Sequence, residues 1–109
     1  MDAIALLIDA IGRPLDATRT VLRGLDAGSL NTQVPGPVSR GNSIAWLVWH
    51  AARQQDAQVA QLAGTDQVWV SGGWAERLHS MRGAGATGFG DTTEPVAALH
   101  VTDPAALLA

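Results

Sequence analysis

Histidine is the residue type most able to do metal or acid–base chemistry here, because the 109-residue chain contains no cysteine. The lack of thiols excludes disulfides, thiolate nucleophiles and cysteine-based zinc sites within this chain. Of the three histidines, His50 lies in an apolar segment that begins near Ile44. A neutral imidazole on a helix that faces a bundle core is a common ligand for zinc, nickel or iron. Taken from the residues alone, a partly buried histidine beside Trp46 is the simpler interpretation.

The three histidines do not have the spacing of a metal triad. Long intervals separate His50, His79 and His100, so no two of them have the i,i+3 or i,i+4 spacing that places ligands on one helix face. We therefore expect His79 and His100 to be exposed to solvent.

The segment from Gly83 to Gly88 matches the G-x-G-x-x-G pattern of dinucleotide-binding proteins in its letters. That pattern binds a pyrophosphate only where a strand precedes it and a helix follows it. Neither flank of this segment has such a pattern, and the sequence predicts a glycine loop without a nucleotide.

The remaining polar and aromatic residues fit structural roles. Arg53 and Asp56 are three residues apart, which predicts an ion pair on a helix surface worth a few tenths of a kcal/mol. No serine lies in the strand-turn-helix setting of a hydrolase nucleophile. The four tryptophans are predicted to be core or interface anchors rather than a cofactor site; they are Trp46, Trp49, Trp69 and Trp74.

Two long helices must position these residues. Apolar residues at three- and four-residue steps predict a helix over about 2–27, kinked or interrupted near Gly12 by Pro14 and capped at Gly28. After a proline-containing loop, a second helix is predicted over about 43–63, with Asn42 or Ser43 as its cap.

The rest of the chain has weaker signals. Residues 64–102 are predicted to be irregular, with a short extended piece at Val68–Val70 and one or two helical turns within 74–80. Asp103 followed by Pro104 is a strong signal for a third helix, at 103–109. Because few residues follow this signal, we expect a single truncated domain over 1–109.

Charge and hydropathy exclude several classes of partner. The net charge of −3 gives no footprint for nucleic acid or for an anionic membrane. The first residues lack the basic region of a signal peptide, and no apolar run is long enough to span a bilayer. A cytoplasmic location is the expectation.

The run from Asn42 to Asp56 resembles the second helix of the DinB-like superfamily, including its mycothiol-dependent and DUF664-type members. The resemblance rests on Trp46, Trp49 and His50 within that run, on the Leu-rich turn 21–25 before it, and on 64–77 and 89–92 after it. It covers nearly all of this chain, but only the N-terminal part of the family fold.

The resemblance implies an all-α, up-and-down four-helix bundle with a three-histidine site for a divalent metal, zinc or nickel. His50 matches the first ligand, while the His-x-x-x-His pair that supplies the other two is absent from the sequence. The implied activity is thiol S-transfer or isomerisation of the mycothiol type, in which the metal lowers the pKa of a low-molecular-weight thiol. We expect this chain alone not to be catalytically competent.

The alternative is a non-catalytic remnant or assembly module that binds another helical chain. The two predicted helices carry more apolar residues than one helix pair can cover. Small chains with thin cores often need oligomerisation to be stable. This pattern predicts a homodimer in which two helix pairs form one four-helix bundle.

Overall fold

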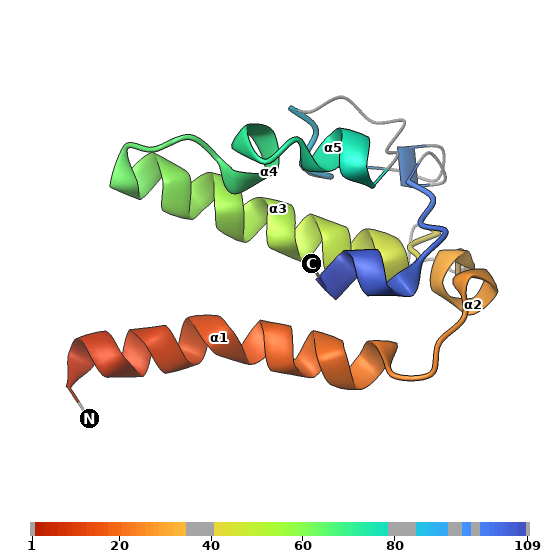
Figure 1. The fold of residues 1–109 in the computed structure, drawn as a ribbon, viewed down its shortest axis with the longest axis horizontal. Helices are drawn as coiled ribbons and strands as arrows, with labels where there is room; N and C mark the ends of the chain where they lie inside the picture. Colours follow the sequence, from red (N-terminus) through yellow and green to blue (C-terminus); the bar gives the residue numbers. More distant parts are fainter. Residues whose placement is uncertain (1, 35–40, 79–84, 92–94, 97–98, 109) are drawn as a thin grey trace.

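The computed structural model describes residues 2–34, 41–78, 85–91, 95–96 and 99–108 (Figure 1). Within these ranges the chain is helical and contains no strand, which confirms the predicted all-α fold. The elements are α1 (Ala3–Leu22), α2 (Ala27–Asn31), α3 (Ile44–Ala63), α4 (Val68–Ser71), α5 (Trp74–Arg77) and the 3-10 helix η1 (Pro104–Leu108). No helix in this part of the chain is long and apolar enough to cross a bilayer.

Helix α1 begins where Asp2 accepts a hydrogen bond from the Ala5 amide at 2.8 Å. It continues through Pro14 without interruption. The prediction of one helix to residue 27 with a cap at Gly28 is wrong, because α1 ends at Leu22. Gly24 then turns the chain with a φ of +77°.

The short helix α2 accounts for the rest of that predicted segment. Its cap is Asp26, whose carboxylate accepts from the Ser29 amide at 2.7 Å. An aspartate in this position favours a new helix start over the continuation of an old helix. Gly28 therefore lies inside α2 rather than at the end of α1.

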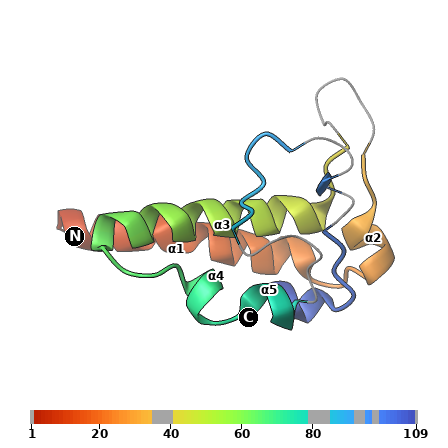
Figure 2. The same ribbon diagram turned by 90° about the horizontal axis from the view of Figure 1, so that it is seen from above.

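Helix α3 has the predicted bounds. The Ser43 hydroxyl accepts from the Trp46 amide at 3.0 Å, and Gly64 ends the helix with a φ of +69°. Helices α1 and α3 run antiparallel, as the two views in Figure 1 and Figure 2 agree.

The segment after α3 folds back along it. The extended piece predicted at Val68–Val70 is wrong: these residues belong to α4. The Asp56 carboxylate accepts from the amides of Val68 and Trp69, both at 2.8 Å, so a side chain from α3 starts this helical turn. The helical turn predicted after Gly73 is confirmed as α5, and the last residues of that prediction lie outside the described part.

The predicted helix start at Asp103 is confirmed, since its carboxylate accepts from the Ala105 amide at 3.0 Å. The helix that follows, η1, contacts both α1 and α3.

Among the described residues, two buried clusters form the core, and α3 contributes to both. One comprises Trp46, Trp49, Trp69, Val96 and Leu99. The other comprises Leu22, Leu30, Ala45 and Val101. Three of the four tryptophans are thus core residues, as predicted, and Trp74 packs against the first cluster. Leu22 is the only residue of α1 that is buried.

Candidate functional site

His50 is held from two sides. Its ring stacks on Trp46, with centroids 4.6 Å apart and planes inclined by 19°. Its Nδ1 lies 2.5 Å from the carbonyl oxygen of Thr87. Because a carbonyl oxygen can only accept, the hydrogen bond requires the proton on Nδ1. In the neutral ring the lone pair is then on Nε2.

The close contact of the 85–91 loop with His50 depends on Gly88. This glycine is buried and has a φ of +90°, and a Cβ built on it would lie 2.6 Å from the imidazole Nδ1. The φ and the lack of space both exclude a side chain. The last glycine of the G-x-G-x-x-G match thus has a packing role, whereas Gly83 and Ala84 lie outside the described residues.

The same loop is anchored on both sides of the imidazole. The Trp46 indole Nε1 donates to Asp91 at 2.9 Å, and Arg53 Nε donates to the Ala86 carbonyl at 3.0 Å. Sequence reasoning missed Thr87 and Asp91 as neighbours of His50. Their contacts are with residues more than thirty positions away, and no local pattern marks them.

Arg53 is buried, with 1% of its surface exposed, which corrects the prediction of a surface ion pair. One guanidinium nitrogen donates to the Gln67 side chain at 2.9 Å and lies 3.6 Å from Asp56. The guanidinium also lies over the Trp69 ring, 5.2 Å from its centroid. Arg53 therefore links α3 to both segments that fold over it.

Two opposite effects act on the pKa of the buried Arg53. Burial lowers the pKa of Arg53 below its ordinary value, and the neighbouring Asp56 carboxylate opposes that shift. An arginine starts so far above neutrality that it stays charged despite this loss of solvation. The Asp56 carboxylate, with its hydrogen bonds to the two α4 amides, is the anionic partner that the buried cation requires.

The donors present do not fit a closed metal site. Among the residues described, no three histidine, aspartate or glutamate side chains are close enough to hold one ion. His100 is exposed, as predicted, and the prediction for His79 falls outside the described residues. Within the described part of the chain, His50 therefore does not belong to a three-ligand cluster.

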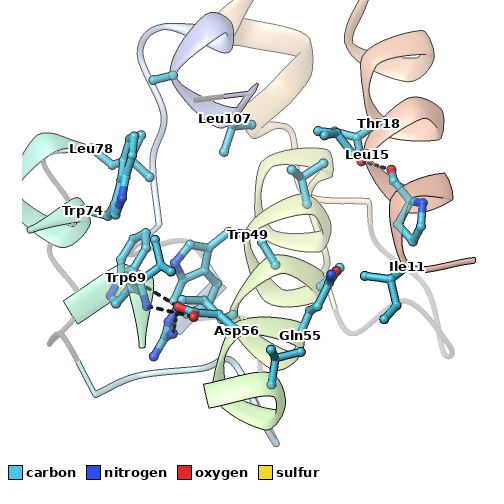
Figure 3. A pocket seen from close by; sticks show the side chains of 18 of the residues that line it. Ile11, Leu15, Thr18, Trp49, Gln55, Asp56, Trp69, Trp74, Leu78 and Leu107 are labelled. Carbon is cyan, nitrogen blue, oxygen red and sulfur yellow. Dashed lines mark hydrogen bonds and ion pairs between the residues drawn. The ribbon is translucent and has the colours of Figure 1, made fainter. Parts of the chain in front are cut away.

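A large groove lies along α3. It has a volume of about 600 Å³ and is lined by α1, α3, the α4–α5 segment and η1. Figure 3 shows Ile11 and Leu15 of α1 on one side of α3, and Trp69 and Trp74 on the other. His50 is not among the lining residues. In Figure 2 the 85–91 loop lies on the opposite side of α3 from α4 and α5.

Comparison with known proteins supports the fold. No family model and no curated protein matches the chain. A solved structure described as the conserved protein of locus from Enterococcus faecalis superposes with a TM-score of 0.84 and 26% sequence identity. The match covers 99% of this chain, which spans 62% of the length of that protein. The description names no activity, ligand or partner.

Proposed function

We propose that this chain is the N-terminal part of a DinB-like bundle, and that its function is to present His50 as one ligand of a divalent metal in a mycothiol-type thiol S-transferase or isomerase. The observation that carries the proposal is the hydrogen bond from His50 Nδ1 to the Thr87 carbonyl. Metal-ligating histidines usually donate their other ring nitrogen to a carbonyl or carboxylate, which fixes the ring and the tautomer.

Two further features support this role. The stacking on Trp46 holds the imidazole plane, so the ring is fixed without a metal. The solved relative has additional chain beyond the 62% that this protein covers. Further ligands would come from additional chain of that kind, because the described residues hold no three-ligand cluster.

The first test is the tautomer of His50, measured by long-range proton–nitrogen NMR. We expect Nδ1 to be protonated and Nε2 to be bare, because the Thr87 carbonyl must receive a proton. A ring protonated mainly at Nε2 would remove the proposed ligand atom and sink the proposal.

The second test measures the zinc and nickel content of the purified chain after dialysis against a mild chelator. We expect no stoichiometric metal, because a single imidazole leaves the other coordination positions to water. About one metal per chain, lost in His50→Ala but kept in the control His100→Ala, would mean that this chain already holds a complete site.

A second candidate function is a module that binds another helical chain. It is favoured by the open groove between α1 and the rest of the molecule, which is lined largely by aliphatic and aromatic side chains. This function needs no metal, and it is tested through the groove rather than through His50.

A further inference from the structure

The apolar face of α1 carries large hydrophobic side chains that remain exposed. Ile4, Ile8, Ile11 and Leu15 form a stripe with steps of four, three and four residues, a spacing that keeps side chains on one helix face. The exposed fractions of Ile4, Ile8 and Ile11 are 71%, 67% and 50%. Because most of the stability of a helix in a protein comes from packing of its apolar face, cover on this face would stabilise α1.

The total exposed surface of the chain is large enough to include an interface with a partner. A folded monomer of this mass is expected to expose about 5,700 Å², whereas this chain exposes 7188 Å². The radius of gyration is 14.6 Å, against about 13 Å for a compact domain of this length. The excess area is about 1,500 Å², more than the roughly 800 Å² that one partner buries in a standard interface.

The two long helices that border the groove are equal in length. Helices α1 and α3 each have 20 residues, and Ala51 and Ala52 of α3 line the groove between them. Such small side chains let a further helix approach closely. Gly12, at the midpoint of α1, also lines the groove, and a Cβ there would meet nothing within 4 Å.

From these observations we propose that the occupant is a second copy of this chain. Helix α1 of each copy lies antiparallel in the groove between α1 and α3 of the other, so the four long helices share one core. The arrangement is isologous: the same face of each copy contacts the partner, and the grooves of both copies are filled in one dimer. It deepens the second candidate function by naming the partner, and it does not depend on His50.

The test is sedimentation equilibrium at micromolar concentration, on the wild-type chain and on two variants of α1. Ile11→Glu places a charge in the groove. Leu6→Glu is the matched control, because Leu6 is 54% exposed on the same helix but lies away from the Ile4–Ile8–Ile11 stripe and outside the groove lining.

We expect a wild-type dimer that Leu6→Glu preserves and that Ile11→Glu weakens by at least tenfold, since burying an unpaired charge is costly. A monodisperse wild-type monomer of 11.3 kDa overturns the proposal, and so does open-ended aggregation. Equal association of the two variants places the interface elsewhere and overturns it as well. His50→Ala is expected to dimerise like the wild type. A failure of the metal proposal can therefore be told apart from a failure of the dimer proposal.

A second variant gives a readout if Ile11→Glu fails to fold. The chain has no cysteine, so Gly12→Cys introduces a single thiol at the midpoint of α1, next to its own symmetry mate in an antiparallel pair. A short bis-maleimide should join two Gly12→Cys chains but not two Leu6→Cys chains, whose thiols are separated by the helix bodies. Cross-linking that is equal in both variants, or absent in Gly12→Cys, contradicts the arrangement.

Discussion

Helices α1 and α3 have the same length and opposite surroundings. Helix α3 buries five of its residues, including Trp46, Trp49 and Arg53, whereas α1 buries Leu22 alone. Yet α1 has the more strongly amphipathic sequence of the two. An amphipathic pattern shows which face of a helix needs cover. It does not show whether the same chain supplies that cover.

Polar anchors account for the difference. Helix α3 holds its neighbours through side chains that reach their backbone: Arg53 to the Ala86 carbonyl, and Asp56 to the amides of α4. The polar bonds recorded for the interior of α1 stay within the helix, as in the pair of Arg13 with Asp9. Polar anchors thus tie one side of α3 to its own chain, whereas α1 has no comparable anchors along its length in the described part of the structure.

The largest expected effect comes from comparing the two arginines. Arg53→Ala should lower the free energy of unfolding by about 3–5 kcal/mol, because it leaves Asp56 and the Ala86 carbonyl without their buried partner. Arg13→Ala removes an ion pair whose side chains are 74% and 45% exposed, and should cost at most about 1 kcal/mol. Urea unfolding followed by tryptophan fluorescence measures both. Similar costs for the two variants would show that the anchors do not distinguish the helices.

A second comparison lies within the loop that covers α3. Gly88→Ala should destabilise the protein by about 2 kcal/mol, since alanine is strained at a positive φ and its Cβ would collide with the imidazole. Gly85→Ala is the matched control, because a Cβ there meets nothing within 4 Å. The NMR signal of the His50 Nδ1 proton should be lost or shifted only in Gly88→Ala. Unchanged stability and an unchanged signal in Gly88→Ala would refute the packing role of this glycine.

Local signals in the sequence predicted α3 with its Ser43 cap and the helix start at Asp103, but they placed the end of α1 at residue 27 instead of Leu22. Ser43, Gly64 and Asp103 act on amides or carbonyls a few residues away, so their effect can be inferred from neighbours. The helical nature of α4 could not be inferred in this way, because the carboxylate that accepts from its first amides belongs to Asp56, which precedes it by more than ten residues. Burial of Arg53 was missed for the same reason: its partners Gln67 and Ala86 meet it only in the folded chain. The position of His50 on its helix was predictable, but its bond to Thr87 was not.

The smallest effect concerns the connection between α1 and α3, where Asp26 caps α2. The backbone and side-chain hydrogen bonds of Ser29 lower the pKa of Asp26 below its ordinary 3.8. A carboxylate with a lowered folded-state pKa stabilises the protein above its unfolded pKa, and that contribution disappears as pH falls through the folded value. Wild type should therefore lose more stability than Asp26→Asn as the pH falls below about 4, in urea titrations at a series of pH values. Asp66→Asn, an exposed acid that caps no helix, corrects for the general effect of removing a charge. Parallel pH profiles for wild type and Asp26→Asn would mean that the charge of this cap does not contribute, and that the connection is held by the packing of Leu22 on Leu30.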